Sequence, residues 1–209
     1  MRVLIKSFLA GMLVSMGCVV FLMSPDKIIG SFLFSFALFA IVNLKLELYT
    51  GKIGYLVLNC NWTYARDLAI TLVGNFLGTL FTAFVIRQTR IDIMETVTAV
   101  TQIKLNDSYI SMFILAIFCG MLMFLGVELF RTIESYLGKV LAVVFVVMIF
   151  IMSGFEHCIA DMFYFNLAGN LNLLTLLVII LGNTVGGTLL CFLLEIGKEN
   201  KQKNITQAP

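Results

Sequence analysis

The stretch VLAVVFVVMIFIMSGFEHCIADMF, residues 140–163, ends a long apolar run with titratable side chains. Glu156 and His157 stand side by side in it, Asp161 follows, and His157 is the only histidine of the chain. If the run spans a bilayer, these groups lie near mid-depth, where each charge costs roughly 2.5 to 3.5 kcal/mol. We therefore expect them to serve a permeation or proton path. The alternative is a packing role, such as a buried Glu–His hydrogen bond between helices.

The composition indicates an integral membrane protein. Apolar residues make up 60% of the chain and charged residues 12%, and the mean hydropathy is +1.02. The 209 residues suit six spans of about 20 residues with short connections, so we expect a single transmembrane domain over residues 1–209. The net charge of +2 gives no basic stripe for nucleic acid. Five cysteines in or beside apolar runs do not suggest a disulfide framework.

An internal repeat divides the chain into two similar halves. A shift of 109 positions places AGMLVSMG (10–17) over CGMLMFLG (119–126), and ELYTGK (47–52) over EHCIAD (156–161). A shift of 108 places VGNFLGTLF (73–81) over LGNTVGGTLL (181–190). The predicted spans are residues 3–23, 28–58 and 63–86 in the first repeat (about 3–88), then 110–130, 139–165 and 171–194 in the second (about 109–194). Three spans per copy make the repeats inverted in the membrane.

The second and fifth spans are too long and too polar to be unbroken helices. Non-helical backbone at membrane depth is tolerated only where protein or a water-filled cavity satisfies it, so we expect both spans to break at a central pore. The lysines and arginines favour cytoplasmic N- and C-termini, eight against four, with residues 195–209 as a cytoplasmic tail. The predicted fold is therefore an all-α membrane protein with six transmembrane helices in two inverted three-helix repeats.

Four motifs resemble those of the formate/nitrite transporter family. SGFEHCIADMF (153–163) is similar to the motif at which that family's fifth helix breaks, and LELYTGK (46–52) is similar to its second-helix loop. FILAIFCGMLMFLGV (113–127) and LGNTVGGTLL (181–190) look like its fourth and sixth helices. The resemblance implies an aquaporin-like fold, a homopentamer in the cell's inner (plasma) membrane, and passage of small monovalent anions or their conjugate acids, of the formate, nitrite or hydrosulfide class.

The resemblance also implies pore positions. His157 is expected to be the central pore histidine and Thr50 its partner from the facing loop. Leu48 and Tyr49 are expected on one side of a hydrophobic constriction and Phe150 on the other. A vestibule lysine and a sixth-helix asparagine complete the set, at Lys104 and Asn183. Histidine has an ordinary pKa of about 6.5, so it can assist proton transfer to a weak-acid anion, which then crosses the apolar ring as a neutral molecule.

Charged side chains beside the two breaks are expected to hold the loops. Glu156 is expected to accept backbone N–H groups, and Glu47 stands at the equivalent place in the first repeat. Where the family usually has asparagine, this chain has Lys52 and Asp161, which suggests a salt bridge between the broken helices. The alternative is two charges solvated in separate vestibules.

Two other functional classes remain as alternatives. An intramembrane enzyme built on the polar cluster is disfavoured because one histidine is too few for a usual zinc hydrolase, and no serine nucleophile stands beside a base. An aquaporin-like channel for water or small neutral solutes shares the inverted arrangement but expects asparagine-proline-alanine loops, and the prolines here are Pro25 and Pro209. We expect no metal and no cofactor. Passive passage and proton-coupled transport both remain open.

Overall fold

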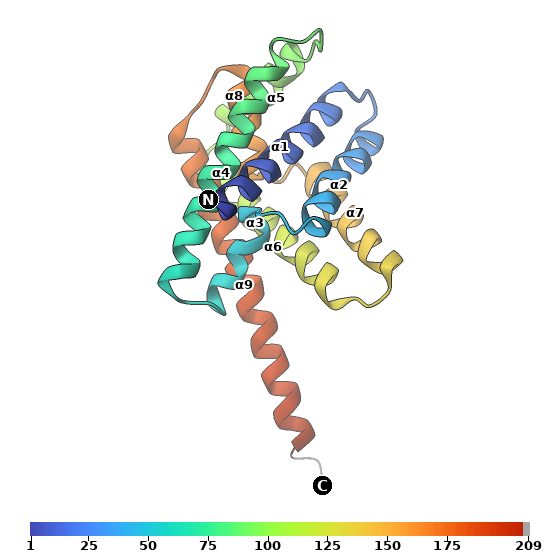
Figure 1. The fold of residues 1–209 in the computed structure, drawn as a ribbon, viewed down its shortest axis with the longest axis vertical. Helices are drawn as coiled ribbons and strands as arrows, with labels where there is room; N and C mark the ends of the chain where they lie inside the picture. The colour runs from blue at the N-terminus through green and yellow to red at the C-terminus, as the bar shows by residue number, and fades with distance from the viewer. Residues whose placement is uncertain (207–209) are drawn as a thin grey trace.

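The chain is all-helical in the part that the computed structural model describes, residues 1–206, with side chains for residues 1–198. Figure 1 shows the arrangement. The elements in chain order are α1 (Arg2–Met23), α2 (Lys27–Asn43), α3 (Tyr49–Lys52), the 3₁₀-helix η1 (Ile53–Val57), α4 (Trp62–Ile86), α5 (Met94–Leu105), α6 (Tyr109–Thr132), α7 (Tyr136–Met152), α8 (Cys158–Ala168) and α9 (Leu173–Thr206).

Among the described residues, four helices are long and apolar enough to cross a membrane: α1, α4, α6 and the segment Leu173–Lys198 of α9. The shorter apolar helices are α2, α7 and α8. The outward faces of the long and the short helices carry large apolar side chains, such as Phe36 on α2, Phe84 on α4 and Phe145 on α7, which are more than half exposed. An all-helical membrane protein, as the composition predicts, accounts for both the helix lengths and these exposed apolar faces.

Both α2 and α7 end inside the apolar body, and they end in the same way. After α2, Lys45 adopts the left-handed conformation (φ 52°), and the Leu46 N–H reaches the Ile41 carbonyl at 3.0 Å. After α7, Gly154 has φ 68°, and the Phe155 N–H reaches the Phe150 carbonyl at 3.0 Å. These are the bonds of a Schellman-type helix end. Because the two ends match at a shift of 109, the repeat seen in sequence extends to backbone geometry.

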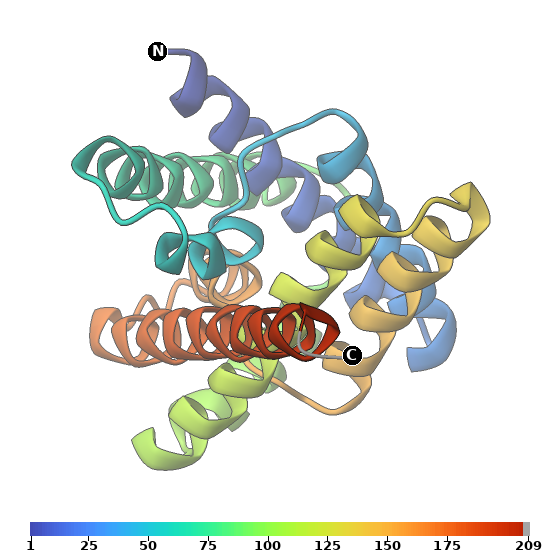
Figure 2. The ribbon, with the colours of Figure 1, turned by 90° about the horizontal axis from the view of Figure 1, so that it is seen from below.

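The packing exchanges short helices between the two halves. α1 packs on α4 and α6 packs on α9, while α2 lies against α7. The short elements cross over: η1 packs on α9, and α8 packs on α4. In Figure 1, α4 rises where α9 descends, and Figure 2 shows the same helices from below, with α2 and α7 together on one side. Each half therefore closes the other, and the two breaks lie between them.

One element is missing from the sequence prediction, since the connection between the halves contains a helix, α5, that we did not predict. In the segment 195–209, predicted as a cytoplasmic tail, α9 continues to Thr206, and residues 207–209 lie outside the described residues. A stretch rich in Glu, Lys and Gln has good helix propensity, so it extends α9 where nothing stops the helix.

Glycines allow the paired helices to touch backbone to backbone. A Cβ on Gly78 would lie 2.2 Å from the Phe8 carbonyl oxygen, and one on Gly186 would lie 1.9 Å from that of Ile117. Small residues at helix interfaces permit this close approach in membrane proteins. The α1–α4 and α6–α9 pairs therefore depend on these positions.

We predict that Gly186→Ala lowers the unfolding temperature of the detergent-purified protein, measured by loss of the size-exclusion peak after heating. Overpacking of this kind costs about 1–3 kcal/mol. The matched control is Gly197→Ala on the same helix, where an added Cβ meets nothing within 4 Å. That change should leave stability equal or raise it by up to about 1 kcal/mol, because alanine is the better helix former. Equal unfolding temperatures for the two variants would contradict the packing argument.

Candidate functional site

The first break is held by the amide of Asn75 on α4. Its Oδ1 accepts the Tyr49 N–H at 2.9 Å, and its Nδ2 donates to the Glu47 carbonyl at 2.9 Å and to the Ser7 carbonyl at 2.8 Å. Asn75 is fully buried. One side chain therefore satisfies three backbone groups, two on the break and one on α1, which water cannot reach.

The second break is held in the same way by Asn183 on α9. Its Oδ1 accepts the Cys158 N–H at 2.9 Å, and its Nδ2 donates to the Glu156 and Ala116 carbonyls, each at 2.8 Å. Asn183 is also fully buried. We predicted Asn183 as a site residue, but not Asn75, although the shift of 108 aligned the two. That alignment was the signal that could have identified Asn75.

Between the breaks, His157 contacts Thr50. The His157 Nε2 lies 3.0 Å from the Thr50 Oγ1, and the His157 Nδ1 accepts the Ala160 N–H at 3.2 Å, so the imidazole also caps α8. Because Nδ1 accepts a hydrogen bond, this bonding assigns the ring proton to Nε2, which donates to Thr50. Both residues are buried, and the His157 ring stacks on Phe150 at a centroid distance of 5.5 Å.

Two cavities flank this pair. The larger, about 840 Å³, is lined on one side by Leu48, Lys52 and Tyr55. The smaller, about 130 Å³, is lined by His157, Asp161 and other residues of the second break. Eight lining residues of the small cavity, shifted back by 109, become residues that line the large cavity: 150, 151, 154, 155, 157, 160, 161 and 164 become 41, 42, 45, 46, 48, 51, 52 and 55.

This relation shows that the two breaks line their cavities with equivalent positions, although residues of both halves line each cavity. The cavities do not share a lining residue, and His157 takes the place in the small cavity that Leu48 takes in the large one. Phe150, which we predicted opposite Leu48 and Tyr49, lines the small cavity instead, while Leu48 lines the large one. The two apolar side chains beside the His157–Thr50 pair therefore face different cavities, Leu48 the large one and Phe150 the small one.

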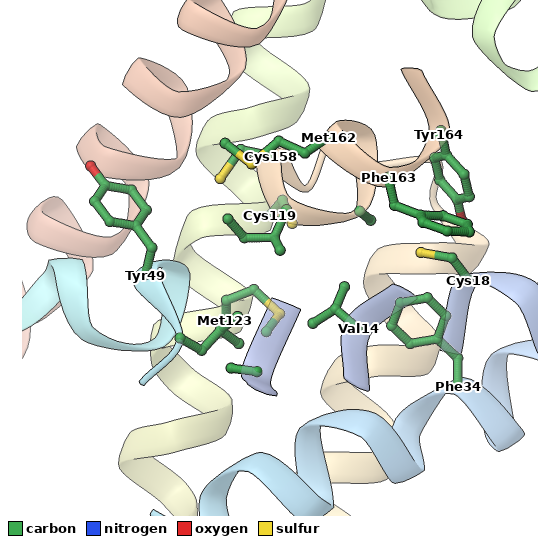
Figure 3. Close-up of a cluster of buried hydrophobic side chains, with 14 of the residues drawn as sticks. Val14, Cys18, Phe34, Tyr49, Cys119, Met123, Cys158, Met162, Phe163 and Tyr164 are labelled. Carbon is green, nitrogen blue, oxygen red and sulfur yellow. The ribbon is translucent and has the colours of Figure 1, made fainter. Parts of the chain in front are cut away.

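Tyr49 lines neither cavity. Its hydroxyl lies 2.9 Å from the Thr184 Oγ1 on α9, and Figure 3 shows its ring directed toward that helix and away from the other labelled side chains. Its N–H is the group bound by Asn75. In this structure Tyr49 fastens the first break to α9, so it positions Leu48 and Thr50, its neighbours in sequence.

The predicted salt bridge between Lys52 and Asp161 is wrong. Lys52 pairs with Glu47, five residues earlier, and Asp161 Oδ1 lies 2.9 Å from the Nζ of Lys104 on α5. The physical reason is that Lys52 and Asp161, although equivalent in the repeat, line different cavities and therefore do not meet. The alternative of two solvated charges is half right: the Lys52 side chain is 36% exposed and that of Asp161 only 1%.

The predicted role of the Glu156 carboxylate is also wrong. It pairs with Lys104 and not with backbone N–H groups, while the Glu156 backbone carbonyl is the group that Asn183 holds. Lys104, predicted as a vestibule lysine, does line the small cavity, but its side chain is 12% exposed and is bound by two carboxylates. These partners could not be predicted, because Lys104 stands on α5, a helix that the sequence analysis did not foresee.

The all-helical body, its exposed apolar faces and the two buried breaks define a membrane protein with several spanning helices. A sequence profile of the formate/nitrite transporter family matches residues 1–197, so the chain belongs to that family. Membership places it among transporters rather than enzymes.

Individual relatives agree with the family assignment. A formate channel of Bacillus thuringiensis, BtFdhC, is 29% identical over 157 residues, which cover 70% of this chain and 58% of that protein. The chain spans about half the length of the curated relatives it matches. A solved pentameric formate channel with formate bound has a TM-score of 0.76 at 22% identity, covering 98% of this chain and 97% of that one. A solved ion channel of the family has a TM-score of 0.81 at 24% identity, covering 88% and 85%. Both structures show the same fold.

We predict that a double-mutant cycle detects no coupling between Lys52 and Asp161. Lys52→Asn and Asp161→Asn should lower the unfolding temperature by amounts that add in the double variant, because each side chain has its own partner. A second cycle, Lys52→Asn with Glu47→Gln, should be non-additive. If the Lys52→Asn/Asp161→Asn double variant recovered stability, that result would support a Lys52–Asp161 salt bridge and contradict the structure.

Proposed function

We propose that the chain is a channel or transporter for small monovalent anions or their conjugate acids, of the formate, nitrite or hydrosulfide class. The observation that carries the proposal is the His157–Thr50 pair, buried between two cavities that the repeat relates to each other. Family membership and the name of the Bacillus thuringiensis relative support the substrate class. A narrow apolar barrier with a single polar pair suits a permeant that loses its charge in transit.

In the proposed topology, six membrane segments form two inverted, aquaporin-like repeats with cytoplasmic termini. The opposite directions of α4 and α9, the matched ends of α2 and α7 and the matched cavities support it. We place the chain in the plasma membrane and, following the solved pentameric relative, propose a homopentamer. The exposed apolar faces would then meet lipid and neighbouring copies.

In the proposed mechanism, His157 assists proton transfer to the permeant anion. A proton from the small cavity binds Nδ1 and displaces the Ala160 N–H, which makes the ring an imidazolium. Nε2 then gives its proton to the Thr50 Oγ1, and the Thr50 hydroxyl gives its own to an oxygen or sulfur of the anion. The ring returns to the neutral state, and the conjugate acid crosses the apolar barrier uncharged. Lys104, Leu48, Phe150 and the positioning residues Tyr49 and Asn183 complete the proposed site.

The test is a panel of formate, nitrite, hydrosulfide and chloride in liposomes at two pH values. We expect larger weak-acid flux at the lower pH, little chloride flux, and a loss of about a hundredfold in weak-acid flux for His157→Asn, the range of general acid–base effects. Asparagine is a good helix N-cap, so this variant can still begin α8. Thr50→Val should lose flux as well, whereas Thr98→Val, at an exposed position on α5, should not.

Two results would count against the proposal. Unchanged flux of every weak acid in His157→Asn would remove the proton-transfer role. Water flux without anion flux in the unaltered protein would favour the alternative, an aquaporin-like channel for water or small neutral solutes. The structure gives that alternative no particular support, since Asn75 on α4 and Asn183 on α9 use their amides on backbone groups of the breaks.

A further inference from the structure

The buried cluster of Lys104, Glu156 and Asp161 contains more acid than base. The Lys104 Nζ contacts a carboxylate oxygen of Glu156 and lies 2.9 Å from the Asp161 Oδ1. The side chains are 12%, 6% and 1% exposed, respectively. With every group ionised, two carboxylates and one ammonium leave one uncompensated negative charge. Burying such a charge costs several kcal/mol in most settings, so proteins usually neutralise it.

The equivalent place in the first repeat is balanced. There, Glu47 pairs with Lys52, one carboxylate with one ammonium, on the large cavity. The shift of 109 turns Glu47 into Glu156 and Lys52 into Asp161, so the second repeat exchanges the base for an acid. Lys104 from α5 replaces the lost cation but does not balance the added carboxylate.

One atom of the cluster has no partner. The Asp161 Oδ2 is buried and lacks a hydrogen-bond partner among the described residues, although buried polar atoms are nearly always satisfied. Asp161 lines the small cavity together with His157. An unpartnered carboxyl oxygen at a cavity, in a cluster with one excess negative charge, is a place where a proton binds and from which it can be donated.

Other charged groups around α8 do not supply the missing balance. The described titratable side chains nearest to Asp161, apart from Lys104 and Glu156, are thiols, a phenol and an imidazole: Cys18 on α1, Cys119 on α6, Cys158 and Tyr164 on α8, and His157. Figure 3 shows Cys18 beside Tyr164. On α4, Asp67 pairs with Arg66, and Arg87 just beyond that helix donates to the carbonyls of Asn166 and Leu167 at the far end of α8.

We propose that Lys104, Glu156 and Asp161 form a proton-binding site that holds one exchangeable proton between the two carboxyl groups and donates it into the small cavity. This proposal rests on the proposed function and adds to it the source of the proton that reaches His157. In the donation step, the O–H bond of the carboxylic acid breaks and an N–H bond forms at Nδ1 of His157, directly or through a cavity water. The cluster is left with a net charge of −1 and regains its proton from the outer water.

The first test counts protonated carboxyl groups by infrared spectroscopy of purified protein at neutral pH, using the carboxylic-acid C=O stretch. Wild type should show one, at a position sensitive to deuterium exchange. Asp161→Asn and Glu156→Gln should each show none, because one carboxylate then pairs with one ammonium. The matched control Asp67→Asn, at a surface ion pair, should keep the wild-type signal.

The infrared outcomes decide the site without reference to transport. A wild-type spectrum without the signal, or a signal that persists in both cluster variants, would overturn the proposal. If one variant fails to assemble, the other gives the same count, since either substitution balances the charge.

The second test compares formate flux in liposomes at pH 6 and pH 8. A proton held by the cluster contributes most to flux at pH 8, where the outer water supplies few protons. Asp161→Asn should therefore lower the pH 8 to pH 6 flux ratio by about tenfold relative to wild type, the factor carried by one pH unit of proton availability. Asp67→Asn should keep the wild-type ratio. A purely structural role for Asp161 would reduce flux equally at both pH values, and that result would overturn the donor role. If wild type carries no formate, the proposed function fails, while the infrared count still decides the proton site.

Discussion

The structure depends on satisfying backbone N–H and C=O groups that water cannot reach. A helix interrupted inside an apolar body leaves N–H and C=O groups that water cannot satisfy, and each such group costs several kcal/mol. Here two asparagine side chains, Asn75 and Asn183, satisfy them at both breaks. The positions of Thr50 and His157 follow from those amides, because each lies within two residues of a backbone group that an amide binds. The His157–Thr50 pair is thus held in place by the same hydrogen bonds that satisfy the buried backbone groups.

The two halves share one backbone plan and differ in chemistry. Leu48 and His157 occupy equivalent places, as do Lys52 and Asp161. The break of the first half lines the wide cavity with Leu48 and the balanced Glu47–Lys52 pair, whereas the break of the second half lines the narrow one with an imidazole and an acid-rich cluster. The repeat gives both halves the same backbone arrangement. The residues that differ at equivalent positions, His157 and Asp161 in the second half, are the ones that can bind or release a proton.

How much the sequence could predict depends on the range of the interaction. The breaks after residues 43 and 152 were predictable because polar residues interrupt apolar runs, and His157 with Thr50 because the motifs that contain them resemble the family's. The partners of Lys104 were not predictable, because Glu156 and Asp161 lie more than fifty residues away in sequence and Lys104 itself stands on α5, a helix that was not predicted. The twelve residues of α5 mix polar and apolar side chains without a long apolar run, so composition gave no sign of a helix that buries a lysine. Lys52 and Asp161 do occupy equivalent positions in the two halves, but the alignment alone does not show that they line different cavities.

The length of α9 has a consequence for the wide cavity. Its 34 residues measure roughly 51 Å at 1.5 Å per residue, while the hydrocarbon layer is about 30 Å thick. Figure 1 shows the helix leaving the body as a straight rod, and Glu195 and Lys198 on it line the wide cavity. Within the described residues, one side of that cavity is thus bounded by a helix that is longer than the hydrocarbon layer is thick.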